Sequence, residues 1–472
     1  MYADHVLLPD HDQTVAARID LDGRTIACVT VQDRPTFLAS PEAADTLDLG
    51  ARLLTPAFAN AHTHLSMVAL RGLGGDDARR GNVVEDLWFR LEGLQSAEDI
   101  RAFARIGALE CVLSGQGAAF DHYYHARSVG LAMADVGLEG VVAETLQDLG
   151  GPAQSLWSEG LDRTEALATD TFLAEHGVFG AAGPHATDTV SDVLWARITA
   201  LARRLDLPLH LHLAQSAEEL GRARAAGFDS PVRRLLAHGR LDGIERVWLA
   251  HGLFVTSSDR AALSPQRDVL VHCPLAQTQF AFPADVPAWR DAGIAVALGT
   301  DAGACNDGMD VQREVILLAH GASYGTTFGT DLGARLGADP DQGGAFVEAV
   351  RVRRLDQRAP WAEPRRALDA VWDVPARLHP RLPVGRIAVG SRASLCAWDL
   401  DHPAFWPAAE PLRALAFGAP GSALHTVIVG GQVIGEVGDP SALLRREQTR
   451  AWVAEASARR HELLRRAGVS GA

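Results

Sequence analysis

The apolar and polar positions of this chain follow one rhythm at its two ends and another in between. Residues 1–52 alternate apolar and polar positions in short bursts, with turns such as Asp22-Gly23, which predicts β strands. From about residue 53, short apolar runs alternate with longer helical stretches, which indicates repeated β-α units and a parallel sheet. The strand rhythm returns near Pro383 and continues to Ile434. We therefore expect a central α/β domain and a β-rich domain built from both chain ends.

The central region contains eight predicted strands with helical stretches between most of them. The strands are Leu53–Ala59, Gly117–Phe120, Leu138–Ala143, Val178–Ala182, Leu207–Leu213, Arg246–Ala250, Val269–Val271 and Ile294–Gly299, and the clearest helices are Ala97–Ser114, Val190–Leu205 and Ala217–Ala226. Eight parallel strands with helices is the count of a (β/α)8 barrel. The predicted fold class is therefore α/β, a distorted TIM barrel with a small composite β-sandwich domain formed by the N- and C-terminal segments.

The predicted domain boundaries follow these changes of rhythm. Residues 1–52 plus 380–440 form the composite β-sandwich domain, 53–379 form the barrel, and 441–472 form a C-terminal helix. Residues 310–378 read as mostly helical, with Gly-rich breaks near residues 321–337. The last helix, Ser441–Ala467, is rich in Arg and Glu and is expected on the surface.

Composition narrows the function classes. The net charge of −15 argues against nucleic acid or an anionic membrane as the main partner. No apolar stretch has transmembrane length, and the N-terminus shows no signal peptide. The five cysteines are scattered and lack any Cys-x-x-Cys spacing, which is typical of reduced thiols, so a cytoplasmic location is expected. The chain has no lysine, which excludes a Schiff-base lysine and a carboxylated lysine bridging two metals.

The strongest chemical motif is the apolar run that ends in His62 and His64. Side chains alternate along a strand, so these two imidazoles point the same way and make half of a transition-metal site. Alone, the pair is also consistent with two hydrogen-bonded histidines without a metal. Candidate residues at the other predicted strand ends favour the metal site over the alternative, because functional residues of such barrels lie at strand ends. Six ends carry candidates: His62 and His64, His185, His210 and His212 with Gln215, His251, His272, and Asp301.

At this point the sequence resembles a known family. The segments Ala61-His62-Thr63-His64, Gly183-Pro184-His185, Leu211-His212-Leu213-Ala214, Ala250-His251, His272-Cys273-Pro274 and Leu298-Gly299-Thr300-Asp301 are similar to the amidohydrolase superfamily. They most resemble its mononuclear metal-dependent deaminases and chlorohydrolases, such as S-adenosylhomocysteine, adenosine and guanine deaminases and triazine hydrolases. The stretches Arg71-Gly72, Trp88–Glu92 and Gly385–Asp399 agree with that branch.

The resemblance implies a role for each matching residue. It makes His62, His64, His212 and Asp301 the ligands of one divalent ion per chain, Zn²⁺ first and Fe²⁺ as the alternative. His251 and Asp301 would orient a metal-activated water and accept its proton. The substrate would be a small heterocycle, and a homodimer or higher homo-oligomer is an option that relatives suggest.

The substrate-facing residues leave alternatives open. His185 would contact the substrate, and Trp88 would stack on a ring or fill a small loop core. Glu92 aligns loosely with a carboxylate that grips ribose hydroxyls in relatives, or faces solvent on a helix. His210 reads as a packed, hydrogen-bonded core residue, and His272 as either supporting the site or structural. His122 and His125 read more readily as a solvated loop than as the mouth of the site.

Gln215 departs from the family pattern. Deaminases of this branch usually carry Glu here, which protonates a ring nitrogen, whereas an amide donates a hydrogen bond but transfers no proton. Glu218 and Glu219 follow closely and are candidate substitutes. Three functions remain: a hydrolytic deaminase of a nucleobase, nucleoside or related amino-heterocycle or amidine; a hydrolase that displaces halide or alkylamine from an aromatic heterocycle; or a catalytically weak member that binds a ligand.

Overall fold

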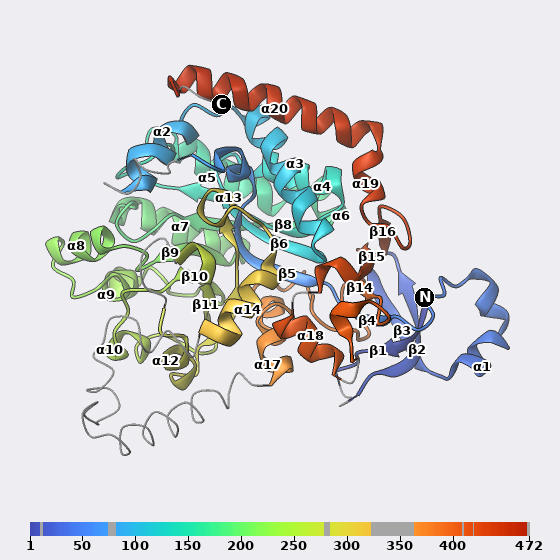
Figure 1. The fold of residues 1–472 in the computed structure, drawn as a ribbon. Helices are drawn as coiled ribbons and strands as arrows, with labels where there is room; N and C mark the ends of the chain where they lie inside the picture. The colour runs from blue at the N-terminus through green and yellow to red at the C-terminus, as the bar shows by residue number, and fades with distance from the viewer. Residues whose placement is uncertain are drawn as a thin grey trace, which may run out of the picture.

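Two β sheets and a set of surrounding helices make up the computed structural model of this chain (Figure 1). The structure describes residues 1–9, 13–73, 82–277, 284–321, 363–407, 410–418 and 420–469. The larger sheet has nine strands, the smaller has seven, and the smaller combines strands from both chain ends. The prediction of a barrel-like α/β fold with a second, composite β unit is therefore confirmed, while the exact domain boundaries remain predictions.

The larger sheet is parallel throughout, and its strands follow the order of the sequence except that the last strand lies beside the first. Its strands are β5 (Phe58–His64), β6 (Gln116–Tyr123), β7 (Glu139–Leu146), β8 (Val178–Pro184), β9 (Leu209–Leu213), β10 (Val247–His251), β11 (Asp268–His272), β12 (Ala295–Leu298) and β13 (Asp301–Ala302). Every expected barrel strand overlaps one of them. Because both faces of such a sheet are covered, its strands are almost continuously buried and rich in apolar residues.

The first expected strand, Leu53–Ala59, is divided between the two sheets. Leu53–Pro56 forms β4, which pairs with β1 and β14 of the smaller sheet, and only Phe58–His64 enters the barrel as β5. Pro56 has no N–H group and ends the pairing, so the chain changes sheets at this point. The histidine pair thus lies at the end of a strand that begins at Phe58 and not at Leu53, where the apolar run begins.

The barrel is closed by contacts between its first and last strand positions. β13 follows β12 after two residues and pairs with β5, with Asp301 opposite Thr63. Asn60 and Thr300 bond reciprocally: the Asn60 amide donates to Thr300 Oγ1 at 2.8 Å, and the Thr300 N–H donates to Asn60 Oδ1 at 3.0 Å. This closure brings the end of the last strand beside the histidine pair.

Helices cover the outside of the barrel and connect its strands (Figure 1). The α helices are α1 (Arg34–Leu38), α2 (Phe89–Glu92), α3 (Ala97–Leu113), α4 (Ala126–Val136), α5 (Trp157–Ala168), α6 (Thr171–Glu175), α7 (Asp192–Leu205), α8 (Ala217–Ala225), α9 (Pro231–Leu236), α10 (Ser257–Arg260), α11 (Pro274–Gln277), α12 (Val286–Asp291), α13 (Gly303–Asn306), α14 (Val311–Gly321), α17 (Pro364–Asp369), α18 (Pro411–Phe417), α19 (Ala442–Arg445) and α20 (Glu447–Ala467). The expected helices after residues 97, 190 and 217 are α3, α7 and α8. The predicted Gly-rich breaks after residue 321 lie outside the described residues.

The smaller sheet has the order β16-β15-β14-β4-β1-β2-β3. Its strands are β1 (Tyr2–Val6), β2 (Val15–Asp22), β3 (Thr25–Val31), β4 (Leu53–Pro56), β14 (Leu395–Trp398), β15 (Leu424–Val429) and β16 (Gln432–Ile434). Buried Glu139, at the start of β7, joins this sheet to the barrel. It pairs with Arg24 at 3.0 Å and with Arg392, and Ser394 Oγ donates to it at 3.0 Å.

The C-terminal helix α20 braces the segment between β5 and α3 (Figure 1). Arg460 Nε donates to the Ala69 carbonyl at 2.7 Å, and Arg466 Nη1 donates to the Leu94 carbonyl at 2.9 Å. That segment carries several residues of the pocket described below, so the helix supports the site as well as covering the surface. In the described part of the chain, no helix is both long and apolar enough to span a bilayer.

Candidate metal centre and active site

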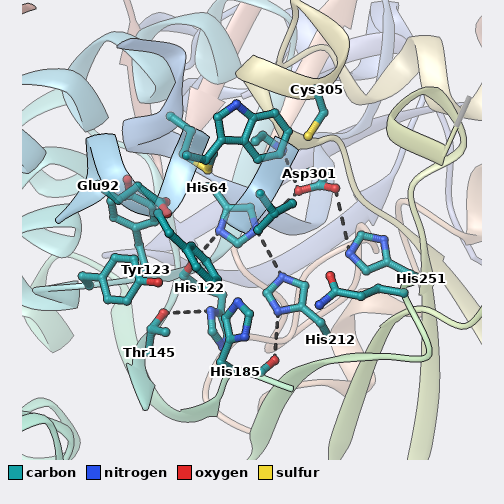
Figure 2. A pocket seen from close by; sticks show the side chains of 17 residues that line it. His64, Glu92, His122, Tyr123, Thr145, His185, His212, His251, Asp301 and Cys305 are labelled. Atoms are coloured by element: carbon teal, nitrogen blue, oxygen red, sulfur yellow. Dashed lines mark hydrogen bonds and ion pairs between the residues drawn. The ribbon is translucent and has the colours of Figure 1, made fainter. Parts of the chain in front are cut away.

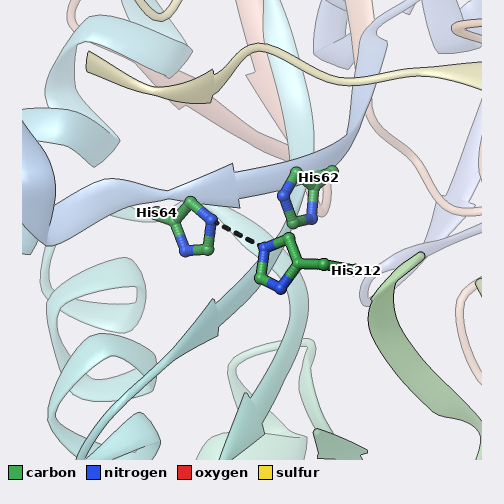
Figure 3. Close-up of side chains that lie close together, drawn as sticks. All are labelled: His62, His64 and His212. Atoms are coloured by element: carbon green, nitrogen blue, oxygen red, sulfur yellow. Dashed lines mark hydrogen bonds between the residues drawn. The ribbon is translucent and has the colours of Figure 1, made fainter. Parts of the chain in front are cut away.

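Three buried histidines from two barrel strands meet at the carboxyl ends of the sheet (Figure 3). His62 and His64 leave β5 on the same face, as strand alternation predicts, and His212 comes from β9. One ligand atom from each lies within 4.8 Å of the others. The Nε2 atoms of His64 and His212 are 3.3 Å apart.

The Nδ1 side of each ring is fixed by a hydrogen bond. His64 Nδ1 donates to the His122 carbonyl at 2.5 Å, and His212 Nδ1 donates to the His185 carbonyl at 2.9 Å. Carbonyl oxygens only accept, so both Nδ1 atoms carry a proton and both Nε2 atoms face the cluster. Two Nε2 lone pairs facing each other at 3.3 Å repel unless a proton or a metal ion lies between them. Tetrahedral ligands about 2.1 Å from one Zn²⁺ are about 3.4 Å apart, so the separation fits a shared ion.

Asp301 and His251 complete the cluster. Asp301 Oδ1 lies 3.3 Å from His64 Nε2 and 3.8 Å from His62 Nε2, while Asp301 Oδ2 lies 3.9 Å from His251 Nε2. His62 Nε2 is buried and has no hydrogen-bond partner among the described residues, so a ligand position is open on it. Three imidazoles and one carboxylate are a donor set that suits Zn²⁺ and Fe²⁺. The residues therefore fit the metal that the sequence predicts.

Burial and the neighbouring carboxylate together set the protonation states in this cluster. Burial lowers the pKa of His62 and of His212 well below the ordinary value, which keeps both rings in the neutral, ligating form. Burial also opposes protonation of His64, but the hydrogen bond to Asp301 outweighs it and raises the pKa of His64. Burial opposes ionisation of Asp301, but the hydrogen bond from His64 outweighs it, so the pKa of Asp301 is lowered. Asp301 is thus an anion, which is the form that binds a cation and accepts a proton.

The backbone around the cluster is strained and tightly packed. His251 and Asp301 have φ angles of 80° and 60°, in the left-handed region that costs a non-glycine residue about 1–2 kcal/mol. Such strain gathers at functional sites. Gly299 lies directly against His62, and a Cβ at this position would be 2.7 Å from the His62 backbone. A larger residue at 299 would therefore displace a candidate ligand.

A pocket opens beside the cluster (Figure 2). It is lined by His64, Met67, Val84, Trp88, Phe89, Glu92, His122, Tyr123, Tyr124, Thr145, His185, His212, Gln215, His251, Asp301, Ala302 and Cys305. Every candidate named from the sequence for catalysis or substrate binding is therefore present: His251, Asp301, Gln215, His185, Trp88 and Glu92. His62 does not line the pocket, and it is a candidate only as a metal ligand.

The aromatic wall of the pocket comes from the segment before α3. Trp88 is the last residue of the short helix η4 (Val84–Trp88) and is 5% exposed. Its indole Nε1 is buried without a hydrogen-bond partner among the described residues. Phe89 packs edge-on against His185, with ring centroids 5.7 Å apart. Planar rings prefer such surroundings, so this wall suits a flat, heteroaromatic ligand.

Gln215 lies in the pocket, but the two glutamates that follow it do not. Its backbone N–H donates to Glu219 Oε2 at 2.9 Å, and Thr187 Oγ1 donates to Glu219 Oε1 at 2.7 Å. Glu219 is thus buried behind the pocket wall, where it positions the backbone of Gln215. Glu218 is exposed at the start of α8. Neither glutamate lines the pocket, so neither replaces the missing carboxyl there.

Several pocket residues differ from the sequence prediction. His122 is buried on β6 and lines the pocket, so its prediction as a solvated loop residue is wrong; the strand continues further than its apolar part. His125 is half-buried at the start of α4 and does not line the pocket. Tyr123, Tyr124, Thr145, Phe89 and Cys305 were not singled out from the sequence as pocket residues.

The two remaining candidate histidines, His210 and His272, lie behind the site. His210 is a hydrogen-bonded core residue, as expected, and its partner is a candidate ligand: His210 Nε2 lies 2.7 Å from His62 Nδ1. It therefore orients that ligand. His272 is buried at the end of β11 and does not line the pocket, and burial lowers its pKa to about 3.

Comparisons with known proteins agree with the fold and the cluster. Residues 53–434 match the Amidohydrolase family. A 5-methylthioadenosine/S-adenosylhomocysteine deaminase from Halobacterium salinarum is 28% identical over 396 residues, covering 84% of each chain. The fold is also that of an adenosine deaminase from Xanthomonas campestris with bound zinc, with a TM-score of 0.76, 22% identity, and 98% and 97% of the two chains covered.

A second solved structure widens the range of chemistry found on this fold. The zinc complex of an atrazine chlorohydrolase from Arthrobacter aurescens matches with a TM-score of 0.74 and 20% identity, covering 97% of this chain and 98% of that one. The fold and the histidine cluster define a hydrolase of the metal-dependent type. This chain belongs to the amidohydrolase family, and the resemblance seen in the sequence is confirmed.

Proposed function

We propose that this protein hydrolytically deaminates a small amino-substituted heterocycle, such as a nucleobase, a nucleoside or a related compound. The observation that carries the proposal is the pair of Nε2 atoms of His64 and His212, which face each other at 3.3 Å beside ionised Asp301. That arrangement calls for a cation at the floor of a pocket with an aromatic wall. The deaminase relatives, with 28% identity over most of the chain, support the same reaction.

His62, His64, His212 and Asp301 would hold one divalent ion, with Zn²⁺ first and Fe²⁺ second. Zinc is the metal named in the two structural neighbours described above. When bound, such an ion lowers the pKa of a coordinated water toward neutrality and so provides the nucleophile. The hydrogen bonds at Nδ1 hold the rings in the ligating tautomer before the ion arrives.

The protein's own residues handle the proton and the substrate. Asp301 accepts the proton of the attacking water and later returns it to the departing nitrogen. Burial lowers the pKa of His251, so the ring is neutral and orients the water by hydrogen bonding. Trp88 and Phe89 provide the surface for a planar ring, and His185 contacts its edge. The Gln215 amide positions the substrate without transferring a proton.

A second candidate function is displacement of halide or alkylamine from an aromatic heterocycle. The observation that favours it is Gln215, because halide leaves without protonation and so needs no carboxyl at this position. The chlorohydrolase with the same fold supports it. A third outcome is a protein that keeps the metal and binds a ligand without turnover.

An ammonia-release screen tests the proposal. The metal-loaded protein is incubated with purines, pterins, adenosine derivatives, guanidines and triazines, and ammonia and ring products are measured together. The Asp301→Asn variant is the matched control. We expect ammonia in equal amount to the ring product. A ring product without ammonia supports displacement of another group, and binding without any product would overturn the assignment as an enzyme.

A further inference from the structure

We propose that Glu92 supplies the proton that the family's usual carboxyl would give, and so acts as the general acid in place of Gln215. This inference rests on the proposed hydrolytic function. Among the described residues that line the pocket, two carry a carboxyl group: Asp301 and Glu92. Asp301 belongs to the metal cluster, so Glu92 is the remaining carboxyl that can reach a bound substrate.

Glu92 is placed to act on a ligand. It is the last residue of α2, is 8% exposed, and lies on the same short segment as Trp88 and Phe89. In Figure 2, Glu92 and Tyr123 lie to one side of His64, and Asp301 and His251 lie to the other. A planar ring between these two sides would meet the nucleophile at one edge and Glu92 at the opposite edge.

The surroundings of the two carboxyls shift their pKa values in opposite directions. The groups that act on Glu92 are Tyr123 on β6, which bonds to it, and His64 on β5. Burial raises the pKa of Glu92 to about 7 against both influences, whereas the pKa of Asp301 is lowered. Both nitrogens of His64 are directed elsewhere, to the His122 carbonyl and to the metal cluster. One carboxyl is thus suited to accept a proton and the other to donate one.

The proton balance of the reaction can be written with these two groups. The water oxygen forms a bond to the ring carbon, and one water proton passes to Asp301. The proton of Glu92 passes to a ring nitrogen at the far edge of the ring, conjugated with that carbon, which takes up the electron pair that the attack displaces through the ring. The C–N bond to the amino group then breaks, its electron pair leaves with nitrogen, and the proton from Asp301 completes ammonia. The remaining hydroxyl proton goes to solvent, which also reprotonates Glu92.

The alternative role for Glu92 is to bind ribose hydroxyls, and kinetics separate the two roles. Glu92→Gln keeps the shape and a hydrogen bond to Tyr123 but loses the transferable proton. As a general acid, its loss should lower kcat by about 10²–10⁴-fold on ribosylated and sugar-free substrates alike, with KM changed less than about threefold. A ribose-binding role predicts a higher KM for the ribosylated substrate and an unchanged kcat for the sugar-free one, which would overturn the inference.

The pH profile adds a second readout. The acid must be protonated, so kcat of the native enzyme should fall as pH rises through the pKa of Glu92, which burial raises. Glu92→Gln should remove that alkaline decline. Glu314→Gln is the matched control, because Glu314 is buried, has a pKa raised to about 8, and lies outside the pocket lining. The control should keep the decline, and a decline that persists in Glu92→Gln would contradict the inference.

A spectroscopic readout does not depend on turnover. The infrared difference between native and Glu92→Gln protein, both metal-loaded, should contain the band of a protonated carboxyl that titrates near neutral pH. Absence of that band down to pH 6 would overturn the general-acid role. Failure of the native protein to turn over any compound would instead count against the proposed function. Equal metal content and equal Tm in both proteins show that Glu92→Gln is folded.

Discussion

The two sides of the pocket hold their polar groups in different ways. On the metal side, the outer nitrogens of His62, His64 and His212 each have a fixed neighbour in the fold. On the substrate side, the buried Nε1 of Trp88 and Nε2 of His122 have no hydrogen-bond partner among the described residues. A buried polar group without a partner costs about 1–3 kcal/mol, which a bound ligand can recover. The comparison indicates a preorganised metal site facing a surface completed by the substrate.

The largest effect is expected from removing a ligand on the metal side. The native protein should hold about one divalent ion per chain. His62→Ala should leave less than about a tenth of that metal and abolish turnover, because His62 belongs to both groups of candidate ligands. Elemental analysis of the purified proteins measures this. An unchanged metal content in His62→Ala would contradict the ligand assignment.

Asp301→Asn tests the carboxylate in the same cluster. The substitution keeps the size and one oxygen but removes the charge and the proton acceptor. We expect turnover below about a tenth of native, while the fold survives because the residue lies at a strand end. Steady-state kinetics and thermal unfolding check both parts. Activity above that level would rule out Asp301 as the proton acceptor.

The next effect concerns a residue behind the ligands. His210 holds His62 Nδ1 at 2.7 Å, so His210→Ala should weaken metal affinity by about 10–100-fold without removing a ligand. Competition with a metal chelator measures the change. His272→Ala is the control, because the buried Nδ1 of His272 has no hydrogen-bond partner among the described residues, whereas His210 bonds to a candidate ligand. Equal affinity in the His210 variant and the native protein would show that the bond has no positioning role.

The smallest effect is expected on the substrate side at Gln215. Gln215→Ala removes one hydrogen bond worth about 0.5–1.5 kcal/mol, so substrate binding should weaken about two- to tenfold. Gln215→Glu restores the family's acid and should rescue part of the activity lost in Glu92→Gln. Kinetics of the single and double variants measure both effects. A loss in Gln215→Ala as large as that in Asp301→Asn would show that the amide takes part in the chemistry.

The difference between the metal side and the substrate side of the pocket also explains how much of the site the sequence could predict. The ligand candidates follow from strand alternation and from the rule that functional residues lie at barrel strand ends, so His62, His64, His212 and Asp301 could be named in advance. Glu92 is buried and bonds to Tyr123, which comes from another element of the barrel. Glu219 turns to Thr187 on the neighbouring loop, which no local pattern of α8 records. Contacts between distant segments determine where Glu92 and Glu219 lie, and the local periodicity of the sequence does not record such contacts.

The most direct test of the account is the position and number of metal ions in a crystal of the native protein. Anomalous diffraction at the absorption edges of zinc and iron identifies the ion and places it. We predict one peak, about 2.0–2.2 Å from Nε2 of His62, His64 and His212 and from an Asp301 oxygen. Two peaks bridged in the pocket, or a single peak away from these four residues, would contradict the mononuclear site on which the proposed function depends.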